Sequence, residues 1–135
     1  MSGQRLIKSE VTEMSEEQLN FILKTLMNDV EGIQSVALVS REGLIVNSIL
    51  EEDVSPMHIA AMSAIILSTC ERVLLEFRKG ELDVCIIQGT EGKFICMGCG
   101  EDFILVCVLE EDSRMDLVFT KMRSNVKKVR DLTEE

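Results

Sequence analysis

The stretch from Phe103 to Leu109 places the strongest constraint on the fold, because the strand that it predicts is apolar on both faces. Successive side chains of a strand point to opposite sides. Both alternating sets are apolar here: Phe103, Leu105, Cys107 and Leu109 on one side, and Ile104, Val106 and Val108 on the other. Such a strand belongs in a sheet that is covered on both faces. We therefore expect helices on both sides of the sheet.

The segments around this strand predict the other elements. Helical periodicity and capping residues predict three helices, and runs of aliphatic residues between turn residues predict four further strands. The helices are expected at 15–31, 56–79 and 113–132, and the strands at 33–40, 44–50, 82–88, 93–98 and 102–110. The order α-β-β-α-β-β-β-α predicts an α/β fold, a three-layer α/β/α sandwich around a five-stranded antiparallel sheet.

The predicted domain organisation is simple. Residues 1–14 have mixed charge and weak periodicity, which is typical of a flexible N-terminal tail. The first helix is expected to begin at Ser15, which has Gln18 at the capping-box spacing. A chain of 135 residues with 46% hydrophobic content has the size of one domain. We expect residues 15–135 to form it.

The central helix contains the segment MHIAAMSAIILSTC, which has no formal charge at neutral pH. One stripe is predicted to dock on the sheet: Ile59, Met62, Ile66, Cys70, Val73 and Phe77. The opposite side carries small and apolar residues where a monomer ordinarily has Lys and Glu. Small residues let a second backbone approach closely. We expect this side to pair with its own copy in a homodimer; the alternative is a helix buried wholly within its own domain.

The net charge and the targeting signals limit the partners and the location that can be expected. A net charge of −10 repels phosphate backbones, so we expect no nucleic-acid partner. No signal peptide is evident, and the uncharged run is shorter than a membrane span. We therefore expect a cytoplasmic protein without a transmembrane segment. The last helix is locally basic, and it is either a solvated face or a contact for an acidic partner or an anionic membrane.

The cysteines raise the question of a metal or redox site. Five is an odd number and most lie inside apolar runs, so we interpret them as reduced. Cys96 and Cys99 have the CxxC spacing of a zinc or thioredoxin-like site. Zinc would also need Cys85 or Cys107, since the only histidine, His58, begins the central helix. No paired carboxylates, triad or metal cluster predict an enzyme, and we expect no catalytic residues and no cofactor.

The stretch from Ser55 to Arg123 resembles the Roadblock family of dynein light chains and small-GTPase regulators. The similarity lies in the small-residue-rich central helix that ends in a Gly-Glu-Leu turn at Gly80, in the three strands that follow, and in the apolar start of the last helix. The segment 32–46 resembles the first hairpin of the family. Asp116 departs from the pattern, because many members have a glycine there.

This resemblance implies a profilin-like Roadblock fold and a non-enzymatic homodimeric or heterodimeric regulator or scaffold of a Ras-like small GTPase, with a GTPase-activating or adaptor role. It also implies a dimer built through the central helix and the third strand. The residues of that surface would be Met57, Ala60, Ala61, Ala64, Ser68, Leu75, Leu82, Val84 and Ile86. The alternative function is a ligand-sensing or cysteine-based redox or zinc domain.

Overall fold

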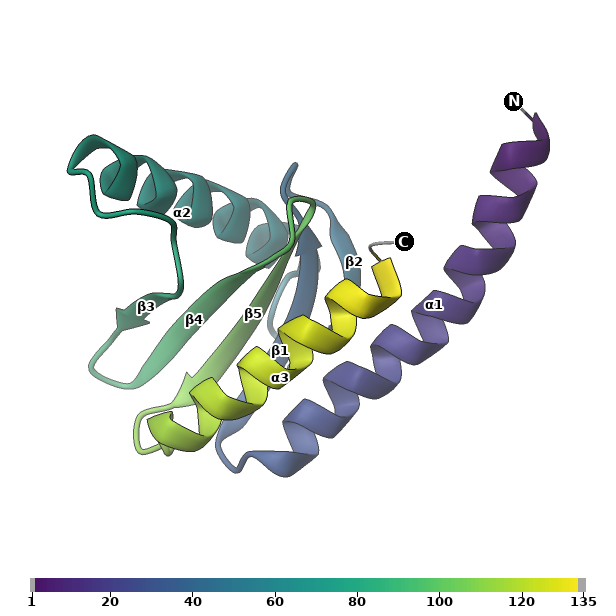
Figure 1. The fold of residues 1–135 in the computed structure, drawn as a ribbon. Coiled ribbons are helices and arrows are strands. Elements are labelled where there is room, and N and C mark those ends of the chain that lie inside the picture. The colour runs from purple at the N-terminus through teal and green to yellow at the C-terminus, as the bar shows by residue number, and fades with distance from the viewer. Residues whose placement is uncertain (1, 134–135) are drawn as a thin grey trace.

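One antiparallel sheet with the strand order β2-β1-β5-β4-β3 forms the centre of the molecule (Figure 1). The computed structural model describes the backbone of residues 2–133 and the side chains of residues 16–133. The strands are β1 Ile33–Ser40, β2 Ile45–Ile49, β3 Cys85–Gln88, β4 Gly92–Cys99 and β5 Phe103–Glu110. The central position of β5 follows from its composition, since it is the strand that is apolar on both faces.

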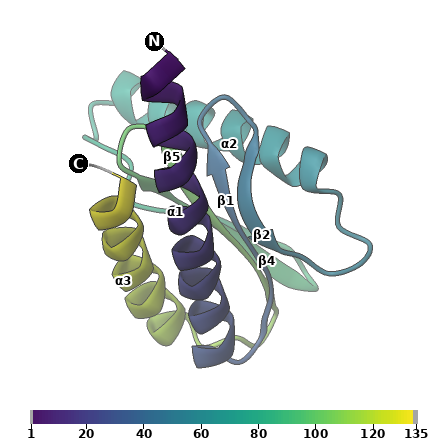
Figure 2. The same ribbon diagram turned by 90° about the vertical axis from the view of Figure 1, so that its right-hand side faces the viewer.

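Three helices cover the two faces of this sheet. Helices α1 (Ser2–Asp29) and α3 (Met115–Thr133) lie side by side on one face, and α2 (Pro56–Glu76) lies on the other (Figures 1 and 2). The predicted three-layer α/β/α sandwich, the five-stranded antiparallel sheet and the order of elements are confirmed.

The alternation along β5 divides the interior into two cores. Leu105, Cys107 and Leu109 are buried in the core beneath α1 and α3, together with Leu23 and Met122. The intervening side chains enter the core beneath α2; they are Ile104, Val106 and Val108. Burial of apolar area on both faces is the main stabilising term of such a layered fold.

Two predicted boundaries are wrong. Helix α1 begins at Ser2 and not at Ser15, so its helical backbone includes residues 2–14. The division of the chain into a flexible tail of residues 1–14 and a domain of residues 15–135 stays a prediction. The side chain of Ser15, which carried the predicted cap, lies outside the described residues. Strand β3 begins at Cys85 and not at residue 82. Its shortening has a visible cause, because Asp83 turns to Arg123 of α3 instead of pairing along β4.

The turns that position α2 follow their sequence signals. Ser55 caps the helix by accepting a hydrogen bond from the His58 N–H at 3.3 Å, and Pro56 is the first helical residue. The hairpin between β1 and β2 turns at Gly43, whose φ of +92° favours glycine. The predicted hairpin is thereby confirmed.

By length and composition, α2 is the one helix among the described residues that could cross a membrane. In the structure it packs on the sheet through Ile59 and Leu67, as an element of the second core. The absence of a membrane span stays a prediction.

Candidate interaction surface

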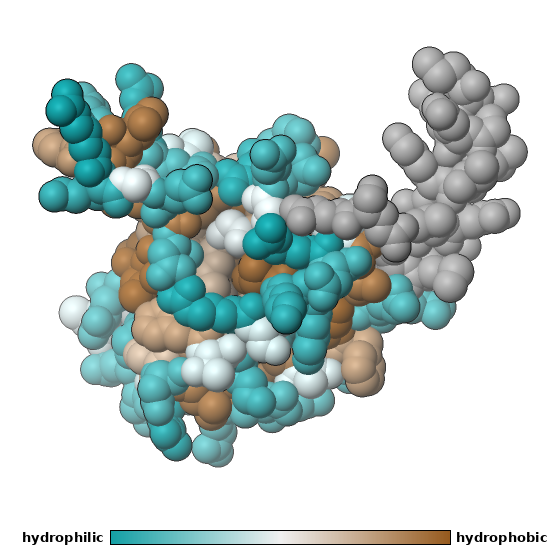
Figure 3. All heavy atoms as spheres, viewed as in Figure 1, coloured by the Kyte–Doolittle hydropathy of each residue, from teal (hydrophilic) through white to brown (hydrophobic). Residues whose placement is uncertain are grey.

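Many large apolar side chains are exposed on α2 and on the neighbouring edge strand β3. Leu75, Met57 and Ile65 are 77%, 76% and 64% exposed, although each is large and apolar. We call this surface the α2–β3 face; its other exposed members are Met62, Val73, Phe77, Ile86 and Ile87. In Figure 3, hydrophobic side chains (brown) lie among hydrophilic ones (teal) at the upper left, where the C-terminal end of α2 is found in Figure 1. A concentration of exposed apolar side chains of this kind is typical of an interaction site.

The other side of α2 is held close to the sheet by small residues. Ala60 and Ser63 are buried, and the Ser63 hydroxyl donates a hydrogen bond to the Ile59 carbonyl at 2.5 Å, so its burial leaves no polar group unpaired. The β1–β2 hairpin also packs against α2: a Cβ on Gly43 would lie 3.6 Å from the Cα of Ala61. Ala60 and Ser63 therefore serve packing within the chain.

One ion pair links the C-terminal half of α2 to the tips of two hairpins. The Arg41 guanidinium donates to both carboxylate oxygens of Glu71 at 2.9 and 3.0 Å, and it also donates to the Gly100 carbonyl at 3.1 Å. Both bonds to the carboxylate come from one nitrogen, Nη1, while Nη2 binds the Gly100 carbonyl. The guanidinium of Arg41 therefore links α2 to both hairpins.

Strand β3 leaves one sheet edge open beside this helix. It pairs with β4 alone, so its other edge has no partner strand among the described residues. An unpaired edge exposes backbone N–H and C=O groups that can accept another strand. Ile86 and Ile87 lie on this edge strand and are 44% and 45% exposed.

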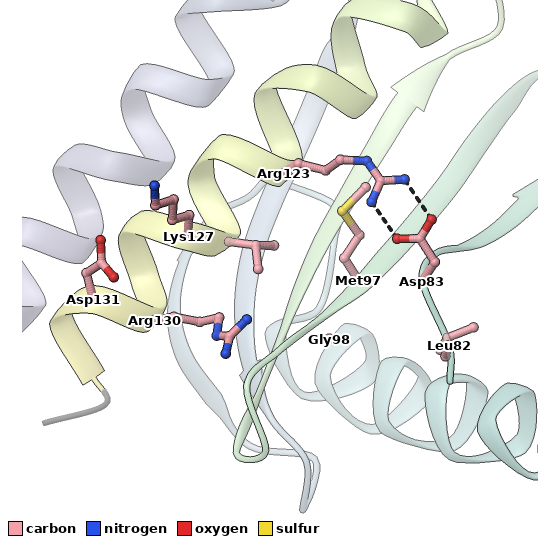
Figure 4. Close-up of a pocket in the computed structure, with 9 residues that line it drawn as sticks. Leu82, Asp83, Met97, Gly98, Arg123, Lys127, Arg130 and Asp131 are labelled. Atoms are coloured by element: carbon pink, nitrogen blue, oxygen red, sulfur yellow. Dashed lines mark hydrogen bonds and ion pairs between the residues drawn. The ribbon is translucent and has the colours of Figure 1, made fainter. Parts of the chain in front are cut away.

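A groove between β4 and α3 is lined by several charged residues of the last helix. It has a volume of about 620 Å³ and runs between α3 and the segment that leads into β3 (Figure 4). Arg123 reaches across the groove and binds Asp83 with both guanidinium nitrogens, one of them at 2.8 Å. Arg114 and Lys121 also pair within the chain, with Asp116 and Asp29 at 2.8 and 3.6 Å. These pairs favour the interpretation of the basic helix as a solvated face.

The CxxC cysteines do not form a site. Cys96 and Cys99 lie on β4 at an odd separation, and they enter opposite cores, Cys96 beneath α2 and Cys99 beneath α1 and α3. One metal ion cannot bind both, so the zinc hypothesis for this pair is wrong. Among residues with described side chains, no group of three or more His, Cys, Asp or Glu residues could hold a metal ion.

Comparison with known proteins decides the family. The model of the Roadblock/LC7 domain matches residues 21–109, which is more than half of the chain. The chain belongs to the Roadblock/LC7 family. Among curated proteins, this Roadblock/LC7 chain is 28% identical over 104 residues to the uncharacterized protein MJ1340 of Methanocaldococcus jannaschii, covering 77% of this chain and 90% of that protein.

Solved structures share the Roadblock/LC7 fold. A Roadblock/LC7 domain from Streptomyces avermitilis superposes with a TM-score of 0.79 at 18% identity, over 83% of this chain and 94% of that one. An MglB structure described as a tetrameric arrangement has a TM-score of 0.81 at 14% identity, over 89% of this chain and 90% of that one. The α-β-β-α-β-β-β-α order of the present Roadblock/LC7 chain is thus a known arrangement.

The structure sorts the residues that the sequence assigned to a Roadblock dimer surface. Met57, Ala61, Ser68, Leu75 and Ile86 are exposed. Ala64, Leu82 and Val84 are half-buried. Ala60 is 1% exposed and lies in the core beneath α2, so it is not on the outer surface. Whether the exposed members contact a second copy stays a prediction.

The predicted docking stripe of this Roadblock/LC7 chain is wrong for three of its six members. Met62, Val73 and Phe77 are exposed, and the buried residues are Ile59, Ala60, Ser63 and Leu67. At 100° per residue, the buried stripe is rotated by about 70° from the predicted one. Sequence reasoning therefore missed Ile65, which lies near the centre of the exposed side.

Proposed function

We propose that this protein is a non-enzymatic homodimeric regulator or scaffold of a Ras-like small GTPase. The observation that carries the proposal is the uncovered α2–β3 face, which includes Ile65 and Leu75 and lies on the opposite side of the sheet from α1 and α3 (Figure 2). Membership in the Roadblock/LC7 family supports it, because the family resemblance implies regulation of small GTPases through such a surface.

The proposed dimer has two-fold symmetry. In a two-fold contact the same patch of each copy meets its equivalent, so α2 packs against its symmetry mate and the two β3 edges lie side by side. Two β3 strands related by this axis run antiparallel, which would extend the five strands of one copy into those of the other. One solved structure of the same fold, MglB, is described with a tetrameric arrangement, and this supports the proposal that chains of this fold associate with one another.

A GTPase partner would bind the assembled dimer and not a pocket of one chain. The α2–β3 face is predominantly apolar, and the exposed side of α2 adds charges only in its C-terminal half, where Arg72 and Glu76 are exposed. Such a surface suits a protein partner, with apolar contacts at the centre and charges at the rim. We propose no catalytic residue of this chain's own.

Two measurements test the proposal separately. Sedimentation equilibrium at micromolar concentration tests the dimer, for which we expect twice the chain mass of 15.2 kDa. Purified Ras-like GTPases of the same organism, loaded with GDP or with a non-hydrolysable GTP analogue, are then titrated onto immobilised protein. We expect one GTPase to bind in a nucleotide-dependent manner; a dimer that binds none of them in either state would refute the regulatory role and leave self-association standing.

A further inference from the structure

Three thiols meet beneath α2, on the opposite side of β4 from Cys99. The sulfur of Cys70 on α2 lies 3.0 Å from the sulfur of Cys85, the first residue of β3. Cys85 in turn stands directly opposite Cys96 in the register between β3 and β4. All three belong to the core between α2 and the sheet. The separation of the first two sulfurs is about 1 Å longer than a disulfide bond, which measures about 2.05 Å.

A small reagent can reach two of these thiols. A pocket of about 330 Å³ opens beside Cys70 and Cys85, with Val73, Leu82 and Ile86 among its walls. Cys70 is half-buried and Cys85 is 9% exposed. Cys96 is fully buried and does not line the pocket. A reagent entering from solvent therefore meets Cys70 first and Cys85 immediately behind it.

We infer that Cys70 and Cys85 are a dithiol site that reacts with small, uncharged disulfides and closes reversibly into a disulfide between α2 and β3. In the first step the Cys70 thiolate attacks one sulfur of the small disulfide, and one small thiolate leaves and takes up a proton. In the second step the Cys85 thiolate attacks the Cys70 sulfur, and the other small thiolate leaves and is protonated. Two protein thiols lose two electrons and two protons, and one small disulfide becomes two thiols.

The chemical surroundings set the rate of the first step. Burial, the Cys85 thiol and the Glu71 carboxylate raise the pKa of Cys70 to about 11. Burial, with smaller contributions from Cys85 and Cys70, raises the pKa of Cys96 to about 12. Only the thiolate attacks a disulfide. The rate of closure is therefore expected to rise about tenfold for each unit of pH between 7 and 9.

The disulfide would couple the redox state of the surroundings to the α2–β3 face. It would close the loop of residues 70–85, which contains Val73, Leu75 and Phe77 of that face. Closing a loop of this length restricts the unfolded chain, and the expected consequence is a rise in Tm of about 10 °C at fixed protein concentration. The inference stands on the thiols and on a pocket that is open in the single chain, and it does not depend on the GTPase proposal. Because Val73 and Ile86 also belong to the α2–β3 face, the reagent is expected to enter the free protomer where two copies pair through this face.

The test uses the full chain, reduced and then exposed to bis(2-hydroxyethyl) disulfide at several pH values. Free thiols are alkylated at each time point, and the protein is digested without reduction and mapped by mass spectrometry. We expect the wild-type chain to lose two hydrogen masses, to yield a peptide cross-linked between Cys70 and Cys85, and to show the raised Tm. Cys85→Ser is expected to stop at a stable adduct on Cys70.

Two further variants serve as matched controls. Cys99→Ser removes a buried thiol on the other face of the sheet, and Cys96→Ser removes the third thiol of the cluster; both are expected to keep the cross-link. A wild-type chain with a lasting adduct on Cys70, a cross-link between Cys85 and Cys96, or an unchanged mass would each overturn the inference. Because the mapping is done on the wild type, it decides the question even where a serine variant folds poorly.

Discussion

Replacing Ile65 by glutamate is the sharpest test of the α2–β3 face as a dimer interface. Ile65 is 64% exposed, lies near the centre of the outer side of α2, and contributes little to the protomer's own core. Complete burial of an isoleucine side chain stabilises the folded or associated state by about 1.5–3 kcal/mol. The exposed two-thirds of Ile65 can therefore contribute about 1–2 kcal/mol in each copy, or about 2–4 kcal/mol in a two-fold dimer.

These magnitudes predict a graded series. Ile65→Ala should weaken the dimer by roughly one and a half to three orders of magnitude in Kd, at 1.4 kcal/mol for each factor of ten. Ile65→Glu adds the cost of burying an unpaired carboxylate in each copy, which amounts to several kcal/mol. It should sediment as a monomer at all micromolar concentrations, with the far-ultraviolet circular dichroism of the wild type.

Phe21→Glu provides the matched control. Phe21 is 70% exposed and lies on α1, on the opposite face of the sheet (Figure 2). The substitution places the same charge on an apolar residue of similar exposure, and it should leave the dimer intact. If Ile65→Glu sediments as the wild-type dimer while Phe21→Glu dissociates, the copies meet through α1 and α3 and the reasoning from the α2–β3 face fails.

Substitutions at Arg41, Asp83 and Gly92 test the fold that presents this face. Arg41→Met should lower the free energy of unfolding in urea by about 1 kcal/mol, because the pair with Glu71 is only partly buried. Arg41→Lys should lose part of that stability, because it keeps the charge but not the second guanidinium nitrogen that binds the Gly100 carbonyl. No change in either variant would show that Arg41 does not anchor the hairpins to α2. The pKa of Asp83 is lowered from its ordinary value of 3.8 by its hydrogen bond to Arg123. The pair therefore stabilises the protein above that value and ceases to do so as the pH falls through the lowered one. Asp83→Asn should have a slightly lower Tm than the wild type at pH 7 and the same Tm near pH 2, and a Tm difference that grows in acid would contradict this sign. Gly92→Ala should lower the free energy of unfolding in urea by about 1–3 kcal/mol, since its Cβ would lie 2.6 Å from the Leu109 carbonyl oxygen. Gly89→Ala should lower it less, because its Cβ would lie 3.4 Å from the Gly92 carbonyl oxygen. Equal effects would show that the contact with β5 is not what requires glycine at 92.

The layered architecture was predictable because the side chains of β5 alternate strictly between its two faces, and those on both faces are apolar. Leu105 and Val106 are neighbours in the chain, yet they enter different cores, and no arrangement with one open face could bury both. The length of β3 was not predictable in the same way. Leu82 and Val84 continue the alternation of a strand, but Asp83 between them binds Arg123, which is 40 residues away, and that contact has no local signal.

The difference between the predicted and the observed buried side of α2 shows where apolar periodicity fails. Charged residues would have been a better guide to the orientation of this helix. A helix with apolar residues on nearly all sides has only a weakly defined apolar direction, so Ile59, Met62 and Ile66 fit a docking stripe as well as the observed Ile59, Ser63 and Leu67 do. Charged side chains are the better guide, because burying a charge is far more costly than exposing a methyl group. Arg72 and Glu76 lie seven and eleven residues after Ile65, in the same stripe of the helix, and both are exposed. Two charges in the C-terminal half thus mark the outward side of the uncharged N-terminal half, and they place Ile65, rather than Ala60, on the surface that a second copy would meet.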